Sequence, residues 1–166
     1  MQMTLFHADV VGKAANCAYP HKVVVADTDA LKCVIAHDHV CATYKNNYRN
    51  IANFQMSDVV PMDIDNDHSD DPADWITEDK MDELFGSIDY VLVPSRHHML
   101  PKDGKSARPR YHVYFPIEVC KTQRYIQPLR LHFRKHIRSL MIMLLMLRDF
   151  FLVLMPMRLC GMKVGC

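Results

Sequence analysis

Charge is distributed very unequally along this chain of 166 residues, and the inequality limits how much of it can form one domain. Residues 1–120 carry 11 Lys and Arg against 18 Asp and Glu, whereas residues 121–166 carry nine basic residues and one acid, Asp149. Half of the 12 methionines fall in the last 26 residues. Such a break separates segments of different character. We therefore expect a folded domain over residues 1–120, followed by a basic tail rich in Met and Leu over residues 121–166.

The composition of the chain excludes global disorder, because 49% of its residues are apolar and 23% are charged. Its first seven residues lack the basic and apolar regions of a signal peptide. The most apolar stretch, residues 140–155, is shorter than the about 20 residues of a membrane span and is interrupted by Arg148 and Asp149. The six cysteines form no C-x-x-C pair, which favours free thiols. We expect a cytoplasmic protein without membrane contact.

Hydrophobic periodicity predicts several strands and one helix. Alternating or β-branched runs indicate strands over residues 23–26, 33–40, 58–65, 89–94 and 111–117. Apolar residues at helical spacing indicate a helix within residues 75–85, with Thr77 as its N-cap. A basic loop, residues 96–110, joins the last two strands. The order strand, helix, strand, basic loop, strand is typical of an α+β palm, with a ferredoxin- or RRM-like sheet and flanking helices.

The first candidate site is the pair Asp63 and Asp65, at the end of the strand predicted over residues 58–65. Residues i and i+2 of a strand share one face, so the two carboxylates project together. A hard cation, Mg²⁺ or Mn²⁺, takes such ligands when substrate phosphates complete its shell. Two alternatives are a solvated acidic loop and an EF-hand calcium loop beginning at Asp63. The EF-hand would need a glycine where this chain has His68.

The second candidate site is the basic loop and the histidine that follows it. Lys102, Lys105, Arg108 and Arg110 precede His112 on the strand predicted over residues 111–117. Guanidinium groups grip phosphate oxygens, and an imidazole beside them can donate a further hydrogen bond. The alternative is a solvated basic turn with a structural histidine. An acid-tipped strand followed by a basic loop and a histidine suits metal-dependent handling of a nucleoside triphosphate.

A further group of possible metal ligands comes earlier in the chain: Cys33, His37, His39 and Cys41. Thiolates and imidazoles are zinc ligands, but this spacing matches no common zinc motif. His37 and His39, with Tyr44 and Tyr48 downstream, also suggest a rolling-circle type of metal-dependent nuclease. Such nucleases have an apolar residue between the two histidines, where this chain has Asp38.

Several motifs in order resemble the archaeo-eukaryotic primase superfamily, above all primase-polymerases of bacterial mobile elements and phages. The resemblance covers about residues 3–120. The matching runs are residues 16–22, 37–49, 63–77 (Asp-Ile-Asp at the start), 95–99 (Ser-Arg-His-His-Met) and 104–117 (Gly-Lys-Ser-Ala-Arg-Pro-Arg-Tyr-His-Val-Tyr-Phe-Pro-Ile). One departure is Arg110, which stands where the wider superfamily has the serine of its Ser-x-His motif.

The resemblance implies a DNA primase or polymerase domain that transfers nucleotides by two-metal catalysis. Asp63 and Asp65 then match the metal-binding acids, and His112 matches the histidine that meets the triphosphate. Lys105, Arg108 and Arg110 are the remaining nucleotide-binding candidates. The implied partners are nucleoside triphosphates, a single-stranded DNA template and a replicative helicase. A function from another class is a non-catalytic fragment that binds nucleotide or DNA.

The tail decides between these two functions, because such palms take a third metal-binding acid from a strand beyond the histidine. After Glu118 the only acid is Asp149, in a stretch without a strand pattern. A one-base shift of frame allows residues 140–151 to encode an acidic, helix-compatible string instead. We therefore expect residues from about 121 onward to be frameshifted, the palm to be incomplete and the chain to be inactive as a polymerase.

Overall fold

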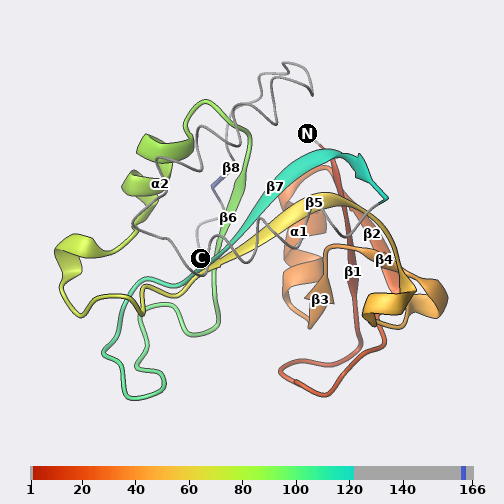
Figure 1. The fold of residues 1–166 in the computed structure, drawn as a ribbon, viewed down its shortest axis with the longest axis horizontal. Helices are drawn as coiled ribbons and strands as arrows, with labels where there is room; N and C mark the ends of the chain where they lie inside the picture. Colours follow the sequence, from red (N-terminus) through yellow and green to blue (C-terminus); the bar gives the residue numbers. More distant parts are fainter. Residues whose placement is uncertain (1, 122–161, 164–166) are drawn as a thin grey trace. The chain divides into compact units, whose positions relative to one another are not determined.

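The computed structural model describes residues 2–121 and 162–163, and its fold is a mixed α+β fold, which confirms the expected class (Figure 1). The described residues divide into two compact units. The first comprises residues 2–60 and 116–121, and the second comprises residues 61–115 and 162–163. The predicted tail of residues 121–166 lies almost wholly outside the described residues. Its expected change of reading frame is therefore left as a prediction.

The first unit contains a three-stranded sheet in the order β2-β1-β3. The central strand β1 (Met3–His7) pairs antiparallel with β2 (His21–Val25) and with β3 (His39–Val40). Met3 and Leu5 of β1 are buried, as the period of two requires for the face of a strand that meets the core. Helix α1 (Thr28–Ile35) connects β2 to β3 and contributes Leu31 and Val34 to the interior.

Helix α1 corrects one prediction, because residues 33–40 do not form a continuous strand. Cys33 belongs to the last turns of α1, and only His39 and Val40 are in β3. The Asp27 side chain accepts a hydrogen bond from the amide of Ala30 and caps the helix. A short apolar run fits a strand or a buried helix face equally well, and the cap before it settles the choice.

A five-stranded sheet has the order β4-β5-β7-β6-β8. Its members are β4 (Thr43–Tyr44), β5 (Phe54–Ile64), β6 (Val91–Pro94), β7 (Tyr111–Cys120) and β8 (Met162–Lys163). These strands confirm the predictions over residues 58–65, 89–94 and 111–117, with shifted ends. The 3-10 helices η1 (Lys45–Asn47) and η2 (Ile51–Asn53) connect β4 to β5.

Strand β7 lies between β5 and β6, although it follows both in the chain. It pairs antiparallel with β6, in a register that sets Val93 opposite His112 and Val91 opposite Tyr114. A strand inserted between two strands that a helix connects is the order of a split β-α-β unit. This order sets the end of β5 beside the start of β7, where the two candidate sites of the sequence meet.

Helix α2 (Glu78–Phe85) contributes Met81 and Phe85 to the buried core of the second unit. The Thr77 side chain accepts a hydrogen bond from the amide of Lys80, so the predicted N-cap is confirmed. Phe85 is buried, and its ring lies 5.1 Å from the ring of Phe115 on β7. The 3-10 helix η3 (Pro72–Asp74) precedes α2. Within the described part of the chain, no helix is long and apolar enough to cross a membrane.

Candidate active site at the β5 and β7 strands

Strand parity places the two predicted metal ligands on the solvent side of the sheet. Asp63 belongs to β5, and Asp65 comes directly after its last residue. Met62 and Ile64, which alternate with them, are only 7% and 3% exposed. The burial of the alternate residues holds the strand in place, so the carboxylates stay at the surface.

His112 of β7 meets Asp63 of β5 across the neighbouring strands. The Nδ1 atom of His112 lies 2.7 Å from Oδ1 of Asp63. Both side chains keep much of their surface exposed, 42% for His112 and 51% for Asp63. The flanking residues Tyr111 and Val113 are buried, so His112 is held on the outer face by its strand. A half-exposed imidazole–carboxylate pair is accessible to a ligand.

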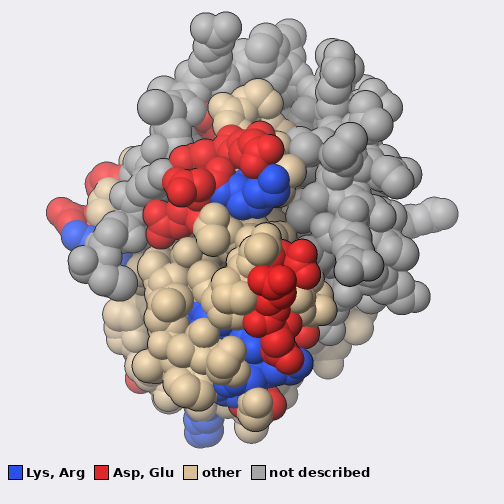
Figure 2. All heavy atoms as spheres, turned by 90° about the vertical axis from the view of Figure 1, so that its left-hand side faces the viewer, with Lys and Arg blue, Asp and Glu red and all other residues tan. Residues whose placement is uncertain are grey.

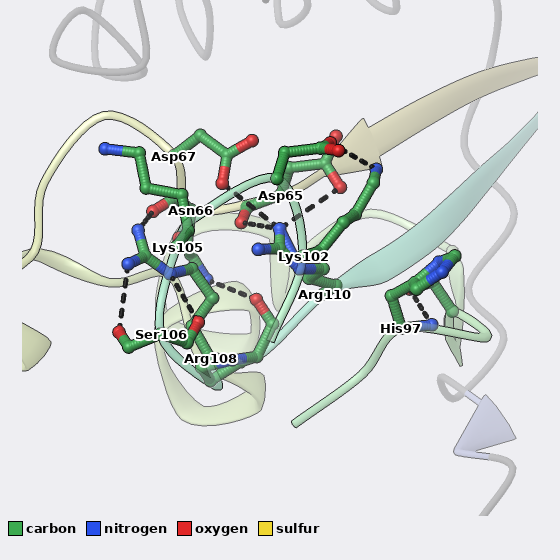
Figure 3. Close-up of polar contacts among 12 residues, drawn as sticks. Asp65, Asn66, Asp67, His97, Lys102, Lys105, Ser106, Arg108 and Arg110 are labelled. Carbon is green, nitrogen blue, oxygen red and sulfur yellow. Dashed lines mark hydrogen bonds and ion pairs between the residues drawn. The ribbon is translucent and has the colours of Figure 1, made fainter. Parts of the chain in front are cut away.

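Arg110 stands two residues before His112 and pairs with Asp65, which makes a second contact across the same strands. Its Nη1 donates to the backbone oxygen of Asp65 at 2.9 Å and to Oδ1 of Asp67 at 3.1 Å. The same nitrogen lies 3.7 Å from the Asp65 carboxylate (Figure 3). Asp63, Asp65, Arg110 and His112 therefore form what we call the cross-strand cluster.

Arg108 occupies a different environment, in which the protein itself uses all of its donors. It is fully buried. Its Nε donates to the backbone oxygen of Ser106, and its Nη1 donates to the backbone oxygens of Asn66 and Ser69. Its Nη2 donates to Asp70 and to the hydroxyl of Ser106. The five N–H groups of a guanidinium are thereby all engaged. The structure thus places Arg108 as an internal tie between the basic loop and the acidic loop.

Trp75 completes the surroundings of Arg108. The guanidinium carbon lies 5.3 Å from the centre of the indole ring, within the range of a cation–π interaction. The indole N–H donates to the backbone oxygen of Ser69, which Arg108 also contacts. We refer to Arg108 with its partners as the Arg108 cluster. Its members are Asn66, Ser69, Asp70, Trp75, Ser106 and Arg108.

Asn66 is the residue of this region that sequence reasoning missed. It is 1% exposed and has a φ of 53°, in the left-handed region that asparagine tolerates. Its side-chain nitrogen donates to the backbone oxygens of Ile76 and Pro109, and its side-chain oxygen accepts from the amide of Ile76. Asn66 thus ties the end of the acidic strand to the start of β7. The sequence feature that could have indicated this role is the position of Asn66 between Asp65 and Asp67, directly after an apolar strand.

The basic loop projects its lysines from a tight turn. Asp103 and Gly104 both have positive φ, and Lys102 and Lys105 form an isolated antiparallel bridge around them. An Asp-Gly pair is typical of such type I′ turns. Nζ of Lys105 lies 3.6 Å from Oδ1 of Asp70, and the lysine side chain is 39% exposed. Lys105 thus stays partly exposed beside Asp70, while Arg108 anchors the base of the loop.

Asp70 is the acid most affected by these cations. The hydrogen bond from Arg108 and then the charge of Lys105 lower the pKa of its carboxyl below the ordinary value of 3.8. Burial raises the pKa of Tyr111 to about 12, with smaller effects from Glu78 and Asp79. Both groups therefore keep one protonation state at neutral pH, with Asp70 charged and Tyr111 neutral.

The run Ser95-Arg-His-His-Met supports the start of β7. The amide of Ser95 donates to the backbone oxygen of Arg110, and the amide of Met99 donates to that of Arg108. Nδ1 of His98 lies 3.0 Å from the Arg110 oxygen, and its ring packs 4.9 Å from that of Tyr111. These contacts fix the backbone from which Arg110 and His112 project.

The donor set partly fits a divalent cation. Asp63 and Asp65 supply carboxylate oxygens of the kind that Mg²⁺ and Mn²⁺ take, with water and phosphate as the remaining ligands. In the described ranges, no group of three or more His, Cys, Asp or Glu is arranged to hold a metal. The site therefore provides two acids of its own and depends on a substrate for further ligands.

The earlier group of Cys and His residues is arranged by ring stacking. His7 stacks on His21 and on His37, with ring centres 4.8 Å and 4.9 Å apart. Nδ1 of His39 lies 2.9 Å from the backbone oxygen of His37. Cys41 is buried and Cys33 is exposed. The zinc and nuclease alternatives for these residues gain no support from these contacts.

Acidic residues are concentrated in the stretch of sequence that leads into the second unit and forms much of it. The tract from residue 58 to residue 89 holds 12 acids and one lysine. Figure 2 views the side on which α2 lies in Figure 1 and shows Asp and Glu side chains gathered in patches, with smaller groups of Lys and Arg. A polyanion would be repelled by the acidic patches of this face.

Comparison of the chain with protein-family models, with curated proteins and with solved structures gave no match.

Proposed function

We propose that this chain carries the metal- and triphosphate-binding part of a primase-polymerase palm. The observation that carries the proposal is the cross-strand cluster: Asp63 bonded to His112, beside Asp65 paired with Arg110, on neighbouring strands. The order of β5, β7 and β6 around α2 agrees with the split β-α-β core of a ferredoxin-like palm. The template would be single-stranded DNA, and a replicative helicase would be the partner that opens it.

The proposed reaction is the transfer of a nucleotide to a 3′-hydroxyl. The hydroxyl oxygen bonds to the α-phosphorus, its proton passes to solvent, and the bond to the bridging oxygen breaks as pyrophosphate leaves with the electron pair. When bound, Mg²⁺ or Mn²⁺ supplies charge neutralisation at the phosphate and activation of the hydroxyl. Asp63 and Asp65 hold the cation, and His112, Lys105 and Arg110 bind the triphosphate. Arg108 acts on the loop and does not touch substrate.

The number of carboxylates in the cross-strand cluster favours a second function, which is binding of nucleotide without catalysis. The cross-strand cluster has two carboxylates, and the described residues add no third one to form a metal-binding group. A two-acid site can bind a metal–triphosphate complex, but a palm needs a third acid for turnover. We therefore propose that the chain as it stands binds nucleotide weakly and does not synthesise primers.

Titration calorimetry with Mn²⁺ and a nucleoside triphosphate tests the proposal. We expect weak binding in the wild type, and loss of binding in Asp63→Asn and in His112→Ala. Asp103→Asn removes an exposed acid from the turn and serves as the control, with unchanged affinity. Tight binding that survives the double change Asp63→Asn and Asp65→Asn would place the site elsewhere. Template-dependent primer synthesis by the purified chain would instead contradict the binding-only alternative.

A further inference from the structure

The two arginines of the basic loop differ in how completely they are bonded. Both are fully buried, yet Nε and Nη2 of Arg110 have no hydrogen-bond partner among the described residues. Only Nη1 of Arg110 is bonded, to Asp65 and Asp67. In Arg108, by contrast, all three guanidinium nitrogens donate to the protein. An unsatisfied buried donor costs about 1 to 3 kcal/mol and calls for an acceptor that the protein does not supply.

The guanidinium of Arg110 lies where a metal cation would neutralise Asp65. Nη1 lies 3.7 Å from the carboxylate of Asp65, one of the two acids that the proposed function assigns to the metal. A guanidinium at that distance neutralises the carboxylate and opposes the approach of a second cation.

We propose that Arg110 is an exchangeable cation, which holds Asp65 and Asp67 in the unliganded site and moves to the triphosphate when a metal–triphosphate complex binds. This inference rests on the proposed function. The incoming divalent cation takes over the neutralisation of Asp65, and the phosphate oxygens become the acceptors for Nε and Nη2. Planar guanidinium groups bind phosphate through two parallel N–H donors, which a lysine cannot reproduce. Metal alone therefore binds poorly, and metal with triphosphate binds cooperatively.

The proposed exchange predicts that the variant Arg110→Gln binds Mn²⁺ alone more tightly and Mn²⁺–triphosphate more weakly than the wild type. Arg110→Gln removes the competing charge, so the affinity for Mn²⁺ alone should rise about five- to tenfold. The same variant loses the donors for phosphate, so the affinity for Mn²⁺–triphosphate should fall about 10- to 100-fold. Arg110→Lys keeps the charge without the planar fork and should leave Mn²⁺ binding weak while also weakening triphosphate binding. Lys32→Gln makes the same change of net charge on α1 and should alter neither affinity.

Mn²⁺ binding by electron paramagnetic resonance and triphosphate binding by calorimetry, both on the full chain, decide the question. Circular dichroism checks that each variant is folded. If Arg110→Gln does not fold, Arg110→Lys tests the loss of triphosphate affinity while Mn²⁺ binding stays weak, and unchanged triphosphate binding in that variant overturns the proposal. A rise in Mn²⁺ affinity together with a loss of triphosphate affinity supports the exchange. Unchanged or weaker Mn²⁺ binding in Arg110→Gln, or no Mn²⁺ binding in any variant, overturns it. The response of triphosphate binding to His112→Ala decides the proposed function separately.

Discussion

The Arg108 cluster and the cross-strand cluster are neighbours in the second unit, yet their polar groups are used in opposite ways. Arg108 has every N–H group bonded within the protein. In the cross-strand cluster, His112 and Asp63 are about half exposed, and Arg110 has two nitrogens without a described partner. Complete satisfaction is typical of a group that holds the fold together, whereas an unsatisfied buried donor is one whose partner the described residues do not supply. Residue type alone does not separate the two cases.

The two clusters differ in hydrogen bonding because their side chains point in different directions. Asn66 and Arg108 reach inward and link the acidic loop to the basic loop: Asn66 donates to the backbone oxygen of Pro109, and Arg108 donates to that of Asn66. Buried backbone oxygens need such partners, so we expect these hydrogen bonds to matter for folding. Asp63 and His112 reach outward from strands whose alternate residues are already buried. The first cluster should therefore control stability, and the second should control binding.

The largest expected effect is the loss of Arg108. Arg108→Met removes five hydrogen bonds and the contact with Trp75, and we expect the free energy of unfolding to fall by about 3 to 4 kcal/mol. Urea unfolding followed by circular dichroism measures it, and the fluorescence of Trp75, the only tryptophan, reports the local change. Lys105→Met is the control and should stay within about 0.5 kcal/mol. A loss below 1 kcal/mol for Arg108→Met would remove the contrast between the two clusters.

A smaller loss of stability is expected at Asn66, where two causes can be separated. Asn66→Ala loses three side-chain hydrogen bonds and strains the positive φ, at a cost of about 2 to 3 kcal/mol. Asn66→Gly loses the same bonds but accepts the backbone conformation, so it should cost about 0.5 to 1 kcal/mol less than alanine. Equal unfolding free energies for the two variants would show that the backbone conformation is not a factor.

Changes in the cross-strand cluster should barely affect stability. Asp63→Asn and His112→Gln each break one half-exposed pair, so unfolding free energies should change by less than about 1 kcal/mol. Both variants should nevertheless lose triphosphate binding. A double-mutant cycle of Asp63 and His112, measured once for unfolding free energy and once for triphosphate affinity, separates a structural role of the pair from a binding role. A coupling energy above 2 kcal/mol in stability would make this pair a structural one and overturn the comparison.

The smallest effect is the dependence of stability on pH at Asp70. The folded pKa of Asp70 lies below its ordinary value of 3.8, because Arg108 and Lys105 favour the charged form. The stabilisation is therefore present above that ordinary value and is lost as the pH falls through the folded pKa. Melting temperatures of the wild type and of Asp70→Asn should differ by a constant amount at neutral pH and converge in acid. A difference that grows toward low pH would contradict this sign.

Local patterns were sufficient for much of the second unit. Alternation predicted β5 and β7, and Thr77 ahead of an apolar helical face predicted the start of α2. Parity within β5 also predicted that Asp63 and Asp65 would project together. The contact between Asp63 and His112 came from the pairing of β5 with β7. In the first unit the same reasoning mistook part of α1 for a strand, because the run from Cys33 onward is short and apolar and the cap at Asp27 was not weighed.

The sequence by itself determined which residues could reach the surface at the end of β5, since strand parity and the apolar character of Met62 and Ile64 are local properties. Only the tertiary structure separated Arg108 from Arg110, two identical side chains two residues apart. Their roles depend on acceptors about 40 residues away in the chain: the backbone oxygens of Asn66 and Ser69 for one, and Asp65 and Asp67 for the other. A buried charge takes its function from its partners, and the fold chooses those partners.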